Sequence, residues 1–322
     1  MHRDARAEAS AIVGDAFEAF VLEPSPPAVS EAPFFADDPL DMGRAGTLTP
    51  LVPAGHPGHT TWDDWLATHG DHEAWVRERW LGGRRRLPTV PEGFSGSRLA
   101  LHRLGAYVIA PLRHQATGKF GLRYTHGGFG TPFFGDDRQL RVVGDEIVDQ
   151  RGRDIATFPI TTLRAAAEAL GGEVSELTRE GDGPAAGDID EPLRVDAAAT
   201  AFLGAWYGMA TAALELVRAT HVGAGRPQLW PGHFDMAAEL GEAPLRGSYG
   251  ASPGDHTIDE PYLYVSVWDP AGAGIEAGAD PWNATAFPGR QLRLSEFTVD
   301  EDPVIVAAAF WSETYDLLTH QG

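Results

Sequence analysis

The segment LWPGHFDMA, residues 229–237, places a histidine and an aspartate two positions apart. In a β-strand, His233 and Asp235 would point to one face of the sheet, and Phe234 would point to the other. A histidine beside a carboxylate can bind a divalent metal ion, or it can act as a general base that the acid orients. This pair is therefore the first candidate for a functional site.

A second polar segment, PGDHTIDE at residues 253–260, supplies further groups of the same chemistry. Together the two segments predict one pocket, whose catalytic groups are His233, Asp235, Asp255, His256 and Glu260. Three aromatic side chains are predicted to wall this pocket and to bind a substrate: Trp230, Phe129 and Trp268. If the pocket holds a divalent metal ion, its ligands are His233, Asp235 and His256.

Two other interpretations of the same residues stay open. The first is a pocket without a metal, in which His233 acts as a base. The second is purely structural: Pro-Gly-His forms a turn, Asp235 caps a short helix that begins at MAAEL, and His233 bonds a backbone carbonyl group. A divalent metal is the one cofactor that the residues suggest.

The remaining motifs do not match known catalytic spacings. The segment GFSGS at 93–97 lacks the last glycine of a nucleophile elbow, so we interpret Ser95 as a helix cap. The segment YTHGGFGTP at 124–132 lacks the lysine of a phosphate-binding loop. A cluster of histidines lacks the zincin spacing, and we interpret its members as solvated loop residues: His56, His59, His69 and His72.

Composition excludes several classes of protein. The chain has 322 residues, of which 43% are apolar, and this is enough for a globular core. The absence of cysteine rules out disulfides and thiolate chemistry. A formal net charge of −21 repels nucleic acid and anionic membranes, so neither is expected as a partner, whereas a small molecule is. The oligomeric state is not indicated.

Two segments bear on localisation. The first twenty residues show no basic start followed by an apolar run, so we expect a cytoplasmic protein. Residues 197–214 carry no charge, but their apolarity comes mostly from alanine. Small residues recur at every fourth position, which predicts a soluble core helix that packs closely on a neighbour: Thr200, Gly204, Gly208 and Ala212.

The pattern of elements predicts an α+β fold, with antiparallel sheets and helices packed on one side. Residues 1–94 are predicted to form a Pro-rich arm and a Trp-rich helix, and residues 95–322 to form the core. Within the core, helix, strands and helix follow in the same order twice, over 95–172 and 195–322. We interpret this repetition as an internal duplication, in which GGFGTPFF and GHFDMAAE occupy equivalent places.

At LWPGHFDMA and SPGDHTIDEPYLYVSVWDP the chain resembles a bacterial, actinobacterial-type family of uncharacterised proteins. Trp230, Phe234 and Asp235 match its Trp…Phe-Asp block, and Phe202 and Trp206 fit the helix before it. The resemblance covers residues 195–270. It implies a shared fold and a shared patch, and it implies no reaction.

Two functions follow as expectations. The first is a small-molecule enzyme, hydrolase-like, that uses the predicted pocket. The alternative is a non-enzymatic module for ligand binding or protein interaction. An enzyme requires the acids and histidines to converge in a concave site, whereas the alternative leaves them scattered and bonded to the backbone.

Overall fold

The computed structural model describes residues 87–320, except for positions 126, 133, 135–137, 152–153, 177–182, 222–223, 226 and 299–300. Most of the predicted N-terminal region 1–94 therefore lies outside the described residues. The histidine cluster at 56–72 lies outside them too.

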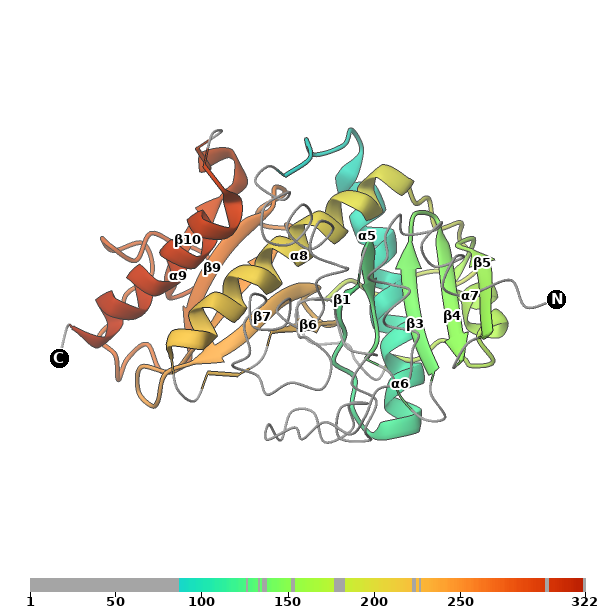
Figure 1. Cartoon of the computed structure of the whole chain (residues 1–322), viewed down its shortest axis with the longest axis horizontal. Helices are drawn as coiled ribbons and strands as arrows, with labels where there is room; N and C mark the ends of the chain where they lie inside the picture. The colour runs from blue at the N-terminus through green and yellow to red at the C-terminus, as the bar shows by residue number, and fades with distance from the viewer. Residues whose placement is uncertain are drawn as a thin grey trace, which may run out of the picture.

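The first half of the described chain is a helix, a five-stranded meander and a second helix (Figure 1). The strands pair antiparallel in the order β1-β2-β3-β4-β5. The elements are α5 (Phe94–Leu104), the π-helical turn η5 (Gly105–Ile109), α6 (Ala110–Thr117), β1 (Arg123–Thr125), β2 (Gly128–Gly130), β3 (Arg138–Val143), β4 (Glu146–Arg151), β5 (Asp154–Pro159) and α7 (Leu163–Ala169).

The second half repeats this order of helix, meander and helix, with sheet order β10-β9-β8-β7-β6. Its elements are α8 (Ala197–Thr220), β6 (Gln228–Trp230), β7 (Asp235–Leu240), β8 (Gly247–Ser252), β9 (Tyr262–Val267), β10 (Gly289–Arg293), the 3-10 turn η6 (Leu294–Glu296) and α9 (Pro303–Thr319). Helices and antiparallel sheets together confirm the predicted α+β class. A common origin of the two halves stays a prediction.

The two halves meet at their first strands. Leu122, beside β1, and Leu229 in β6 form an antiparallel bridge with backbone hydrogen bonds of 2.8 and 2.9 Å. The rings of Phe129 and Phe234 lie edge to face beside this bridge, with centroids 5.0 Å apart. The first hairpins of the two meanders therefore share one buried aromatic contact.

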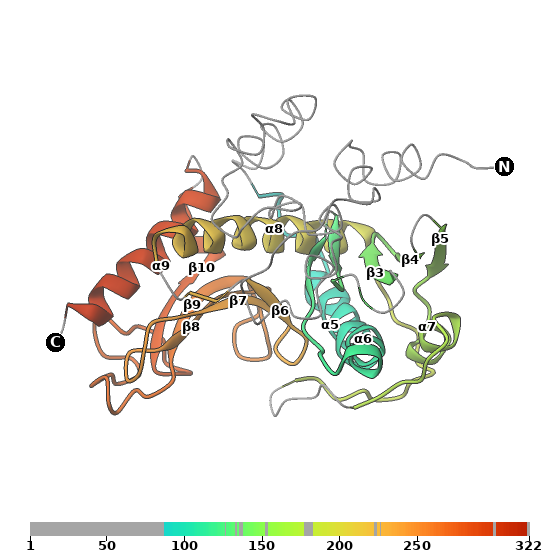
Figure 2. The ribbon, with the colours of Figure 1, turned by 60° about the horizontal axis from the view of Figure 1, so that its bottom comes forward.

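Helix α8 crosses both halves (Figure 2). Asp196 caps it, because its carboxylate accepts a hydrogen bond from the Ala198 amide at 2.8 Å. A Cβ on Gly204 would lie 2.5 Å from the backbone nitrogen of Gly128, so helix and strand touch backbone to backbone. Thr200 and Gly204 of the predicted small-residue stripe thus pack on the first sheet. The span Ala197–Arg218 has the length and apolarity to cross a membrane, and 72% of its apolar window is buried inside the protein.

The helix before β1 lies on the opposite face of the first sheet from α8. A Cβ built on Gly128 would lie near Thr200 of α8. The next residue, Phe129, lies on the other face, and its ring is 3.4 Å from the position of a Cβ built on Gly105 of η5. The sequence places Pro111 inside this helix, where a proline normally kinks or ends the helix because it has no backbone N–H. The helix instead continues through the π-helical turn into α6, and the Tyr107 carbonyl oxygen, four residues before Pro111, accepts a hydrogen bond from the Ser175 amide at 3.0 Å.

The second sheet has two chemically different faces. One is apolar and buried, with Met236, Tyr249 and Val265, and the ring of Tyr249 lies near Tyr315 of α9. Helices α8 and α9 contact each other and this sheet. The other face carries the alternate residues of β7, β8 and β9, most of which are polar, among them Asp235, Ser248, Ser252, Tyr262, Tyr264 and Ser266. Residues 247–254 have the Gly/Ser/Pro composition of a loop, but Gly247–Ser252 form β8.

Candidate functional site

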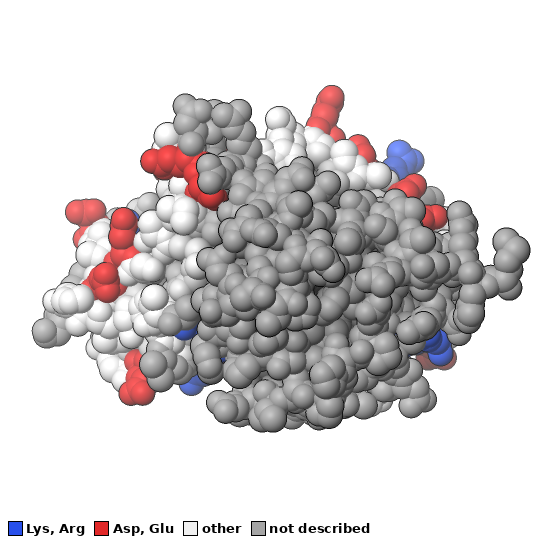
Figure 3. All heavy atoms as spheres, viewed as in Figure 1, with Lys and Arg blue, Asp and Glu red and all other residues white. Residues whose placement is uncertain are grey.

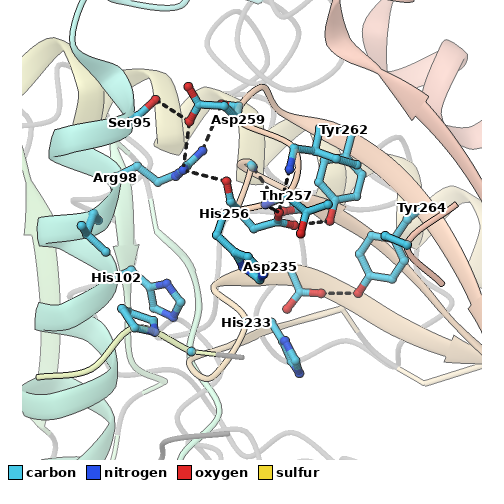
Figure 4. A pocket seen from close by; sticks show the side chains of 18 of the residues that line it. Ser95, Arg98, His102, His233, Asp235, His256, Thr257, Asp259, Tyr262 and Tyr264 are labelled. Atoms are coloured by element: carbon cyan, nitrogen blue, oxygen red, sulfur yellow. Dashed lines mark hydrogen bonds and ion pairs between the residues drawn. The ribbon is translucent and has the colours of Figure 1, made fainter. Parts of the chain in front are cut away.

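A cavity of about 1210 Å³ lies over the polar face of the second sheet. Its other walls are the first turns of α5, the loop 253–259 and the segment around Phe287. The structure brings His233, Asp235, Asp255 and His256 to the lining of this one cavity. Figure 4 labels three of them, His233, Asp235 and His256.

Asp235 is the buried carboxylate of the cavity floor. It begins β7 and is only 4% exposed. The hydroxyl of Tyr264, from β9, donates a hydrogen bond to its Oδ2 atom. Burial raises the pKa of Tyr264 well above its usual range, and the nearby negative charge of Asp235 raises it further. Tyr264 therefore remains a protonated hydrogen-bond donor to this carboxylate at neutral pH.

Asp255 shapes the loop at the rim of the cavity. Its Oδ1 accepts hydrogen bonds from the amides of Thr257 at 2.6 Å and Ile258 at 2.9 Å. Its Oδ2 accepts the Tyr262 hydroxyl at 2.6 Å. Burial is the main cause that raises the pKa of Tyr262, and the bond to Asp255 adds to it. These bonds show that Asp255 holds the loop and Tyr262 in place, and its catalytic role stays a prediction.

Arg98 of α5 connects the helix to the same loop. Its guanidinium donates to the carbonyl oxygens of Pro253, Asp255 and Asp259 over 3.1–3.3 Å, and to the Asp259 carboxylate at 3.3 Å. Ser95, one turn earlier, donates to the same carboxylate at 2.7 Å. We expected Ser95 to cap α5, but the N-cap residue is Gly93.

His102 is a site residue that the sequence did not identify. Its ring stacks on Phe234 with centroids 4.9 Å apart and planes 8° apart. Its Nε2–H donates to the carbonyl oxygens of Pro231 at 2.9 Å and Gly232 at 3.1 Å. Burial lowers the pKa of His102 to about 4, so the ring is neutral at pH 7 and its Nδ1 is an acceptor. Ser95, Arg98 and His102 follow at spacings of three and four, a polar helix face that could have indicated the site.

His233 does not share a strand face with Asp235. Residues 231–234 form a turn, and Phe234 has the left-handed φ of 59°, so the two side chains diverge. Figure 4 shows the His233 imidazole directed away from the Asp235 carboxylate. The alternative of a helix at MAAEL is also wrong, because Asp235–Leu240 is strand β7. His256 stands in the exposed part of the loop at the cavity rim.

The predicted metal centre is not formed. Among the residues that the structure describes, no group of three His, Asp or Glu side chains is arranged to hold a metal ion. The proposed ligands His233, Asp235 and His256 line the same cavity, but they do not converge on one point. The reason is the turn at Phe234, which directs His233 away from the strand.

Four further predicted residues lie outside the lining of the cavity. Glu260 accepts the Ser295 amide at 3.1 Å and pairs with Arg293, so it fixes η6. Phe129 is fully buried in the core. Trp268 is 50% exposed, donates its indole N–H to Ser248 Oγ and lies under the guanidinium of Arg246. Trp230 ends β6 and is half-buried.

No family model, curated protein or solved structure matches this chain.

Proposed function

We propose that the protein binds a small polar molecule in the cavity between α5 and the second sheet. The observation that supports this function is the row of alternate polar residues on three adjacent strands, enclosed by a helix and a loop. Asp235, Tyr264 and Ser266 belong to this row. Concave sites with convergent polar groups are the usual places for small ligands.

The same site supports a second proposal, a hydrolase-like activity. The observation in its favour is Asp235, because a buried carboxylate in a cavity can act as a general base. In this proposal, Tyr264 orients the Asp235 carboxylate, which accepts a proton from water as the water oxygen bonds to the substrate. The bond to the leaving group then breaks, and Asp235 returns the proton to that group. His256, at the rim, is within the same cavity and would contact the leaving group.

The binding proposal is tested by filling the cavity. Ser266→Trp adds a large side chain to the floor, whereas Ser295→Trp adds the same side chain to an exposed turn outside the cavity. A library of small polar molecules is screened by thermal unfolding. A ligand present at a hundredfold excess over its Kd should raise the Tm by roughly 5 °C.

We expect this rise in the wild type and in Ser295→Trp, and its loss in Ser266→Trp. Ligands that raise the Tm of all three proteins equally contradict the proposed site. A library that raises none of them contradicts the proposed function.

A further inference from the structure

Aromatic rings line the part of the cavity beside Asp235. Tyr262 and Tyr264 stand two positions apart on β9, so both face the cavity, and their ring centroids are 6.2 Å apart. Phe287, from the loop before β10, lies edge to face with Tyr264 at 6.0 Å. The three rings thus form a continuous wall next to a buried carboxylate.

Gly250 makes room for this wall. It pairs with Tyr264 across β8 and β9, and a Cβ on Gly250 would lie 2.6 Å from atoms of the Tyr264 ring. Any side chain at Gly250 would therefore displace the ring. The absence of a side chain here positions Tyr264 flat on the sheet, with its hydroxyl at Asp235.

The charged groups of the described lining give it a negative balance. Asp235, Asp255 and Asp259 face the cavity, and Arg98 is the one Lys or Arg among the described lining residues. Arg98 already donates to Asp259 and to three carbonyl groups. The Tyr264 hydroxyl is neutral, so its hydrogen bond does not cancel the negative charge of the Asp235 carboxylate. The site therefore favours a positively charged ligand.

We propose that the ligand of this cavity is an organic cation with an alkylammonium head group. Its charge faces Asp235, and its methyl or methylene groups lie against the rings of Tyr262, Tyr264 and Phe287. Aromatic rings attract such cations through the negative charge of their faces, and a buried carboxylate adds a direct attraction. This inference rests on the proposed binding function and names its ligand class.

The charge of the whole chain agrees with this ligand class. The formal net charge is −21, and on the face that Figure 3 shows, Asp and Glu side chains are spread over the described part of the second half. An acidic surface raises the local concentration of cations and speeds their association.

The decisive comparison uses one cation and its neutral analogue. Choline and 3,3-dimethylbutan-1-ol have the same shape, but only choline carries a charge. Tetramethylammonium and n-butylammonium extend the set of cations. Calorimetric titration of the full chain should show binding of at least one cation, and choline should bind roughly tenfold or more tightly than the alcohol.

Variants assign this binding to the cavity. Asp235→Asn keeps the shape of the side chain and should weaken cation binding by roughly tenfold or more. Phe287→Leu changes a half-buried ring in a loop and should weaken it by roughly threefold to tenfold, even if Asp235→Asn does not fold. The matched control is Asp190→Asn, which removes the same charge from an exposed pair with Arg164 and should leave binding unchanged.

Three results would overturn the inference: none of the cations binds, the alcohol binds as tightly as choline, or neither cavity variant weakens binding. The proposed function would survive them if a neutral molecule binds and Ser266→Trp abolishes its binding. The proposed function would fail together with the inference if Ser266→Trp weakens the binding of neither neutral nor charged molecules.

Discussion

His102 lies between the ring of Phe234 and the carbonyl groups of the β6–β7 turn, and its burial determines its charge. Its pKa is about 4 in the folded protein, against 6.5 in the unfolded chain. Below pH 6.5 the unfolded state therefore binds a proton that the folded state does not. The contribution of neutral His102 to the free energy of unfolding is therefore fully present above pH 6.5. This contribution is lost as the pH falls towards 4.

This linkage predicts the behaviour of His102→Gln, whose amide can still donate to the turn. The free energy of unfolding of the wild type should fall between pH 7 and pH 4.5 by up to about 3 kcal/mol more than that of the variant. Urea unfolding at the two pH values measures the difference. His256→Gln, in the exposed loop, should follow the wild type. Parallel pH dependence in His102→Gln and the wild type would show that His102 does not cause the loss.

The sequence located the site better than it assigned the roles within it. It selected four residues that line one cavity, because polar residues that cluster in apolar segments need a common polar environment. It could not predict that His233 diverges from Asp235, since a phenylalanine with positive φ is rare and depends on tertiary packing. It missed His102 because its chemistry arises from a stack with Phe234, over a hundred positions away in the chain.

Helix α8 and strand β2 are in backbone contact because position 204 is a glycine. A Cβ at this position would meet the backbone of Gly127 and Gly128, which cannot move as a flexible side chain can. Gly204→Ala should therefore lower the free energy of unfolding by about 1–3 kcal/mol, although alanine favours helices. Chemical denaturation measures this change.

Gly96→Ala in α5 is the matched control for this prediction. A Cβ there meets nothing within 4 Å, so the same substitution should stabilise the protein by about 0.5–1 kcal/mol. A stabilising effect of Gly204→Ala, equal to that of the control, would contradict the close packing of α8 on β2.

Strand β8 shows what limits prediction of single elements. Its sequence GSYGAS is rich in residues that are typical of loops, and it has no β-branched side chain. It is a strand because its neighbours require small residues. Gly250 lies beneath the Tyr264 ring, and Gly247 lies close to the Ser266 carbonyl group. Helix α8 was easier to predict, since Asp196 and the uncharged run mark it locally.

At the level of the whole molecule, the alternation of helices and strands was sufficient to predict the α+β class. The junction of the two sheets was not predictable, because the bridge between Leu122 and Leu229 joins segments over a hundred positions apart. The cavity depends on this junction. It brings α5, from the first half, opposite the polar face of the second sheet.

The same bridge has a kinetic consequence. Every other pairing among the described strands joins neighbours along the chain, so each meander can form through local contacts. Loop closure between Leu122 and Leu229 is the one long-range pairing step, and we expect it to come last. In pulse-labelled hydrogen exchange during refolding, the amides of β3, β4, β8 and β9 should gain protection before those of Leu122 and Leu229. The cavity between α5 and the second sheet would then be assembled only in the final folding step, after both sheets exist.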